Sequence, residues 1–107
     1  MVSLVLFACS PEGSPGTEKD TRAVVDQAGR TVEVPRRVER VITTYQPATY
    51  LVFALGAGEK LVGVDVASPG VEFFRLLHPA IARLPGVGSK KGLNLEEIAA
   101  AAPDVVI

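Results

Sequence analysis

Apolar and polar residues alternate early in the chain, in the segment AVVDQAGRTVEVP at positions 23–35. Val32 and Val34 point one way in an extended chain, and the residues between them point the other way. This period of two, interrupted by a short turn that contains Gly29, predicts a β-hairpin with one inward face.

Three compact runs rich in β-branched residues follow, RVITTY at 40–45, KLVGVDV at 60–66 and DVVI at 104–107. Runs of this length and composition are typical of buried strands. We therefore expect strands that begin near residues 41, 61 and 104.

Between the first two of these runs, the apolar spacing changes to that of a helix. Pro47 suits the first position of a helix, and Gly56 suits a left-handed C-cap. The segment is therefore predicted to be an amphipathic helix, whose apolar stripe consists of Ala48, Leu51, Val52 and Leu55.

Two further helical stretches are predicted. Phe74, Leu77 and Ile81 mark the first, with an interruption at Pro79. In the second, Asn94 is expected to cap the helix, with Glu97 as its reciprocal partner. The stripe of this last helix consists of Leu95, Ile98, Ala99 and Ala102, and Pro103 is expected to stop it.

This alternation of strands and helices predicts an α/β fold, a Rossmann-like parallel sheet with flanking helices, preceded by the β-hairpin. A parallel strand is usually covered on both faces. The run Val105–Ile107 has a buried composition, but no helix follows it in the sequence. We therefore expect the chain to be the incomplete first lobe of a larger, two-lobed protein.

Composition excludes several classes of function. The 107 residues carry a net charge of −1, so general electrostatic attraction to nucleic acids is not expected. The densest basic cluster, Arg36, Arg37 and Arg40, has an acid within it and is interpreted as a solvated edge. The absence of Trp argues further against a surface for base stacking.

The amino terminus, MVSLVLFAC, ends in a pattern that resembles a bacterial lipobox. In such a motif the thiol, here that of Cys9, receives the lipid. The Ser/Pro/Gly-rich stretch that follows would be a flexible tether. We expect residues 1–21 to be a lipoprotein-type signal remnant and tether, with 22–107 as the folded lobe and the lipid as the sole membrane anchor. The alternative is an ordinary apolar terminus with an incidental thiol, because no basic residue precedes the apolar run.

Motifs for catalysis or metal binding are weak. The stretch GAGEK at 56–60 runs helix, glycines, strand, whereas a phosphate loop requires a strand before its glycines. His78 has no second ligand at metal-binding spacing. No nucleophile or acid–base pair is recognisable, and Asp65 is interpreted as the close of a strand. The sequence predicts no enzyme, no metal site and no cofactor.

The carboxyl ends of the predicted strands are the best candidate for a binding site, because ligands of open α/β sheets bind at that edge. The loops there are rich in hydroxyl, amide and ammonium groups, which suit a polar or anionic ligand. The candidate ligand-binding residues are Tyr45, Gln46, Ser68, Ser89 and Lys90.

Three segments in order carry a family resemblance: DQAGRTVEVPRRVERVIT, ATYLVFALGAGEKLVGVD and LPGVGSKKGLNLEEIAAAAPDVVI. Over residues 24–107 the chain resembles the amino-terminal lobe of the periplasmic binding proteins that serve iron-siderophore, haem and cobalamin ABC importers. The resemblance implies two lobes that clasp a metal chelate or cobalamin outside the cytoplasmic membrane and deliver it to permease subunits. It also implies that Glu96 docks on the permease, although a first-turn acid also favours the helix dipole.

A second interpretation is a free-standing small α/β domain that binds another protein through the edge at Val105–Ile107. The chain as given would offer only half of a cleft, so we expect it to bind a chelate weakly or not at all.

Overall fold

The computed structural model describes residues 20–107, which belong to two compact units. The described part of the first unit is residues 20–37, and the second unit is Val38–Ile107. Within the described residues, no helix combines the length and the apolar character that a membrane crossing requires.

The first unit contains the predicted β-hairpin. Strands β1 (Thr21–Val25) and β2 (Thr31–Pro35) pair antiparallel, with Val24 opposite Val32. The two valines are 40% and 41% exposed, so the predicted inward face is only partly covered.

Asp26 organises the turn of the hairpin. Its Oδ1 accepts hydrogen bonds from the backbone N–H groups of Ala28 and Arg30, both at 2.9 Å, and its Oδ2 pairs with Arg30 Nε at 2.7 Å. The Arg30 backbone N–H contributes most to holding the pKa of Asp26 below its usual value. Gly29 completes the turn at φ 81°, where only glycine is free of strain.

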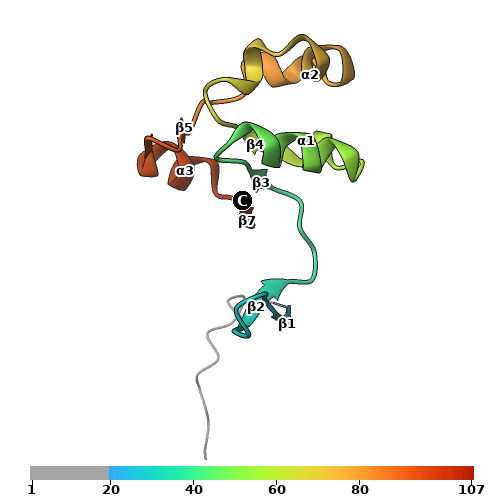
Figure 1. Ribbon diagram of the computed structural model, residues 1–107, viewed down its shortest axis with the longest axis vertical. Coiled ribbons are helices and arrows are strands. Elements are labelled where there is room, and N and C mark those ends of the chain that lie inside the picture. The colour runs from blue at the N-terminus through green and yellow to red at the C-terminus, as the bar shows by residue number, and fades with distance from the viewer. Residues whose placement is uncertain (1–19) are drawn as a thin grey trace, which may run out of the picture. The chain divides into compact units, whose positions relative to one another are not determined.

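The second unit is built on a three-stranded parallel sheet (Figure 1). Strand β3 (Val41–Ile42) lies in the centre, between β4 (Leu61–Gly63) and β7 (Val105–Val106). This confirms the predicted α/β fold with a parallel sheet. β3 contacts both neighbours and is fully buried, whereas Val106 on the edge strand is 46% exposed.

Helix α1 (Gln46–Ala54) ends as predicted. Gly56 adopts φ 73°, its N–H donates to the carbonyl of Phe53 at 2.9 Å, and the next N–H, of Ala57, donates to Val52 at 3.0 Å. This is the Schellman pattern of hydrogen bonds. The predicted apolar stripe is only half correct: Ala48 and Val52 are buried, but the other two positions, Leu51 and Leu55, are 64% and 83% exposed.

Helix α2 (Glu72–Leu77) is short, and the 3₁₀ turn η4 (Pro79–Arg83) follows it, so the interruption at Pro79 is confirmed. Two other 3₁₀ turns, η2 (Gly58–Lys60) and η3 (Ser68–Gly70), precede it in the chain. Of the three predicted core positions, Phe74 and Ile81 are fully buried, but Leu77 is 57% exposed.

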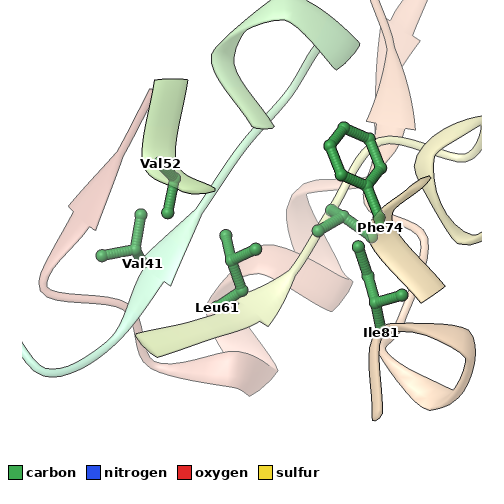
Figure 2. Packing of buried hydrophobic residues seen from close by; sticks show 6 residues of the cluster. Val41, Val52, Leu61, Phe74 and Ile81 are labelled. Atoms are coloured by element: carbon green, nitrogen blue, oxygen red, sulfur yellow. The ribbon is translucent and has the colours of Figure 1, made fainter. Parts of the chain in front are cut away.

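The core lies between the sheet and the first two helices, and its side chains converge in Figure 2. Phe74 is its largest buried residue. Its ring stacks on Phe53 of α1, with 5.1 Å between the centroids, and lies 4.5 Å from that of Tyr50. These contacts hold α2 against α1. The buried cluster consists of Val41, Val52, Leu61, Val64, Phe74 and Ile81.

A short antiparallel pair, β5 (Gly88–Ser89) and β6 (Gly92–Leu93), leads into helix α3 (Leu95–Ala101). The side chain of Asn94 caps this helix by accepting from the Glu97 N–H at 3.2 Å, as predicted. The predicted stripe of α3 is wrong, because none of its residues is buried and Leu95 is 72% exposed.

Arg40 joins the end of α3 to the start of β3. Its guanidinium donates to the carbonyl of Ala101 at 2.6 Å and to that of Ala102 at 3.1 Å, the terminal carbonyls of the helix. In return, Asp104 Oδ2 accepts from the backbone N–H of Arg40 at 3.0 Å. Arg40 is exposed beside β3, as expected for a solvated edge, and in addition its hydrogen bonds help to place α3 and β7 beside β3.

Candidate functional site

A cavity of about 300 Å³ opens at the carboxyl ends of the parallel strands. Its wall comes from the loop between β3 and α1, the loop after β4, and the β5–β6 turn. These loops are far apart in the sequence and are brought together because parallel strands place their carboxyl ends at one edge of the sheet. The lining residues are Thr44, Tyr45, Gln46, Pro47, Asp65, Ala67, Ser89 and Lys90.

Four of the five candidate ligand-binding residues line this cavity: Tyr45, Gln46, Ser89 and Lys90. Tyr45 is 51% exposed, so its ring is available at the rim. The structure separates the fifth, Ser68, from the others. Ser68 is fully buried and does not line the cavity, so the choice of Ser68 as a ligand contact is not supported by its position.

Asp65 lines the cavity and is only 4% exposed. Its Oδ1 accepts from the backbone N–H groups of Ala67 at 3.0 Å and Ser68 at 3.1 Å. Its Oδ2 accepts from the hydroxyls of Ser68 at 2.5 Å and Thr49 at 3.3 Å. The carboxylate therefore has four donors, as many as its lone pairs accommodate.

The hydroxyl groups extend this network towards β3. Thr43, which directly follows β3, and Thr49 of α1 are fully buried, and their hydroxyl oxygens lie 2.7 Å apart. Ser68 Oγ is also 3.2 Å from Thr49 Oγ1. Because buried polar groups are costly unless hydrogen-bonded, this network favours one arrangement of the three segments.

Sequence reasoning missed Asp65 as a cavity residue, although it lies at the carboxyl end of the second strand like the other candidates. The residues that follow Asp65 in the sequence could have indicated its role. An aspartate followed three positions later by Ser68 is typical of a turn in which the side chain accepts backbone N–H groups. What the sequence did not show is that Thr49, sixteen residues earlier, completes the set of donors.

The β5–β6 turn presents Ser89 and Lys90 in a fixed position. Gly88 has φ 114°, and a Cβ there would collide with the carbonyl oxygen of Gly92, so the position requires glycine. The carbonyl of Gly88 accepts from the Val66 N–H at 3.0 Å, which ties the turn to the loop after β4.

Glu96 lies apart from the lining of this cavity, in the first turn of α3. Its side chain is exposed and lies beside a shallow hollow with an apolar border. The border includes Val66, Leu93 and Leu95, which are 61%, 45% and 72% exposed. Cys9, the candidate lipidation site, lies outside the described residues. Within residues 20–107, no group of three or more His, Cys, Asp or Glu could hold a metal ion.

No family model matches the chain. Among curated proteins, the chain is 37% identical over 70 residues to a vitamin B12-binding protein of Vibrio vulnificus, a match that covers 65% of this chain and 23% of that protein.

Among solved structures, a periplasmic solute binding protein from Veillonella parvula matches with a TM-score of 0.70 and 29% identity, over 80% of this chain and 28% of the other. The molybdate periplasmic binding protein MolA of Haemophilus influenzae matches with a TM-score of 0.65 and 27% identity. That match covers 79% of this chain and 27% of the other. The heme binding protein HmuT matches with a TM-score of 0.57 and 26% identity, over 94% of this chain and 30% of the other.

These findings confirm the resemblance to periplasmic binding proteins of ABC importers. The similar proteins are binding proteins and not enzymes, as the sequence predicted for this chain. The chain spans between 23% and 30% of the length of the four proteins named above.

Replacing Ser68→Ala is expected to destabilise the second unit by about 1–3 kcal/mol, because it removes a hydroxyl donor from the buried Asp65 carboxylate. Urea unfolding measures the change. Ser89→Ala is the matched control, since the Ser89 hydroxyl accepts one exposed hydrogen bond and its loss should cost less than about 0.5 kcal/mol. Equal effects of the two substitutions would contradict a special role for the buried network.

Proposed function

We propose that the chain belongs to an extracytoplasmic solute-binding component of an ABC importer, which captures an iron chelate, such as a siderophore or haem, or cobalamin and delivers it to a permease. The similarity to binding proteins for vitamin B12 and heme supports the class of ligand. The similarity of this chain to periplasmic binding proteins supports a location of the protein outside the cytoplasmic membrane.

The observation that carries this proposal is the cavity at the carboxyl edge of the sheet. It gathers Tyr45, Gln46, Ser89 and Lys90 from two loops more than forty residues apart. Ligand sites of open α/β sheets lie at this edge, and the residues there have no catalytic grouping that would indicate turnover.

The four candidate side chains that line the cavity each offer a contact to a chelate. The half-exposed ring of Tyr45 offers a face for stacking and a hydroxyl for a hydrogen bond. Gln46 and Ser89 offer both donors and acceptors. Lys90 is exposed and offers a positive charge to an acidic substituent at the rim. Such a mixture suits a large, mostly uncharged ligand with a few polar groups.

The proposal is favoured over a free-standing interaction domain by the comparisons, all of which lead to solute-binding proteins. The exposed edge at β7, on which that alternative depends, carries Val106 and Ile107 at 46% and 51% exposure. In a two-lobed protein, this edge would be available to further elements of the sheet.

The 107-residue chain is expected to bind a chelate at this cavity with a Kd weaker than about 1 µM, because a one-sided cavity encloses little of the ligand. Gallium(III) siderophores, gallium protoporphyrin and cobalamin are diamagnetic, so titration followed by amide chemical shifts in NMR locates the site. The shifts should concentrate at residues 44–47 and 89–90.

The matched pair for this titration is Lys90→Ala and Lys91→Ala, of which only Lys90 lines the cavity. Lys90→Ala should weaken the binding of an acidic chelate about two- to fivefold, as expected for the loss of one exposed charge. Lys91→Ala should change the affinity little. Micromolar or tighter binding by the chain would show that a second lobe is unnecessary. Saturable shifts that concentrate away from residues 44–47 and 89–90 would contradict this cavity as the chelate site of the proposed function.

We extend the proposal to Glu96 as a contact with the permease. Its carboxylate is exposed in the first turn of α3 and is free to meet a positively charged side chain of a partner. Glu96→Arg is expected to lower chelate uptake by cells at least about tenfold, the effect of losing a charge pair of about 1.4 kcal/mol, without changing chelate affinity.

The control for this variant is Glu97→Arg, on the same helix turn. Cellular uptake of a radiolabelled chelate and solution affinity are measured for both. Undiminished uptake by the Glu96→Arg variant, or an equal loss with Glu97→Arg, would rule out a specific docking role for Glu96.

We also propose that Cys9 carries a diacylglyceryl lipid that anchors the protein, as its lipobox-like sequence indicates. Metabolic labelling with radioactive palmitate in a bacterial host should give a labelled, membrane-associated protein. Cys9→Ser should remove both the label and the membrane association. A wild-type protein that accumulates without label would contradict the anchor.

A further inference from the structure

The floor of the cavity carries a negative charge that the protein does not neutralise. Asp65 is buried, lines the cavity, and forms no ion pair with any lysine or arginine of residues 20–107. All four groups that approach its carboxylate closely are neutral donors, two backbone N–H groups and two hydroxyls.

This carboxylate lies beside the amino-terminal turn of α1, because its Oδ2 accepts from Thr49 in that turn at 3.3 Å. The amino terminus of a helix is where a protein usually binds a small anion, since its free N–H groups and the helix dipole attract negative charge. Asp65 therefore places a negative charge beside the end of α1 to which an anionic ligand would be attracted.

The helix also offers few free donors to an anion. Pro47 has no N–H, and the N–H of Ala48 already donates to the carbonyl of Tyr45 at 3.0 Å. Of the residues that line the cavity, Lys90 is the one with a positive charge, and it lies exposed in the β5–β6 turn. A compact oxyanion has neither several converging N–H groups nor an arginine to hold it.

A ligand cannot use Asp65 as a direct acceptor either, because its four lone-pair positions are already occupied. The residue acts on the ligand through its field, at a distance, in a site where burial reduces solvent screening. It is thus suited to selecting the charge of the group that enters the floor.

We infer that Asp65 makes the cavity reject compact oxyanions, such as molybdate, sulfate and phosphate, and admit an uncharged or positively charged part of a larger ligand. An acidic substituent of that ligand then lies at the rim, near Lys90. This inference rests on the proposed function and narrows its ligand class to chelates that present a neutral or cationic surface to the floor.

The test compares the wild-type chain with Asp65→Asn. The amide oxygen of the variant keeps the two backbone N–H donors, and its NH₂ group can donate to the hydroxyl oxygens of Ser68 and Thr49. The probes are sodium molybdate and sodium sulfate at constant ionic strength, followed by the amide shifts of Gln46 and Ser89. The wild-type chain should show no saturable shift up to the highest concentration tested. The variant should saturate with a Kd at least about tenfold below that concentration, a difference of at least about 1.4 kcal/mol.

Asp26→Asn is the matched control, because Asp26 also accepts two backbone N–H groups in a turn but belongs to the hairpin. It removes the same unit of charge and should leave oxyanion binding unchanged. Saturable molybdate binding by the wild-type chain, or no gain in Asp65→Asn, would overturn the inference. An equal gain in Asp26→Asn would assign the effect to net charge and would overturn it as well.

If Asp65→Asn does not fold, the inference is tested on the wild-type chain by titration with two small ions of opposite charge. Methylammonium should shift the Gln46 and Ser89 amides more than sulfate does, and the reverse order would refute the inference. Failure here is distinguishable from failure of the proposed function. A chain that binds chelates at the cavity and also binds molybdate refutes only the charge selection, whereas a chain that rejects oxyanions but binds chelates away from the cavity refutes only the proposed function.

Discussion

The carboxylate of Asp65 joins three segments that form or support the cavity. Through Oδ1 it holds the loop after β4, at Ala67 and Ser68, and through Oδ2 it holds α1 at Thr49. Thr49 in turn contacts Thr43 at the end of β3. Because the four side chains of this network are buried and hydrogen-bonded, a movement of any segment leaves a polar group unsatisfied. The relative positions of these three segments therefore depend on one charged residue.

Two further features position the loops that line the cavity. The parallel pairing of β3 with β4 places the first two loops at one edge of the sheet. The β5–β6 turn reaches the same edge because the carbonyl of Gly88 accepts the N–H of Val66. The core below, centred on Phe74, holds the helices that follow these strands. A site on loops is thus positioned by rigid elements, as is usual in α/β proteins.

The charges around the cavity support our proposal of a large ligand rather than a small ion. The floor is negative, the rim has one exposed lysine, and the ring of Tyr45 stands half exposed between polar neighbours. The relatives named for their ligands bind molecules as different as vitamin B12, heme and molybdate. A fold shared by such relatives does not identify the ligand, so the residues of the cavity have to do so.

Local patterns in the sequence determined most of the fold. The period of two predicted the hairpin, the β-branched runs predicted β3, β4 and β7, and Gly56, Pro79 and Asn94 predicted where helices end, break and begin. These features depend on backbone conformation and on neighbours within a few residues, which a sequence displays directly. The topological rule for parallel sheets likewise placed four cavity residues correctly.

Tertiary structure alone decided which apolar positions are buried and which polar groups meet. Leu51, Leu55 and Leu95 fit a helical stripe, but they are exposed because no described element packs over them. Ser68 was a candidate ligand contact because of its hydroxyl, but that hydroxyl donates to the buried carboxylate of Asp65. Arg40 donates to carbonyls more than sixty residues away in the sequence. Asp65 lines the cavity, and one of the four donors to its carboxylate, Thr49, comes from another element. Burial and hydrogen bonding between distant segments depend on how the elements pack, and periodicity along the chain carries no record of that packing.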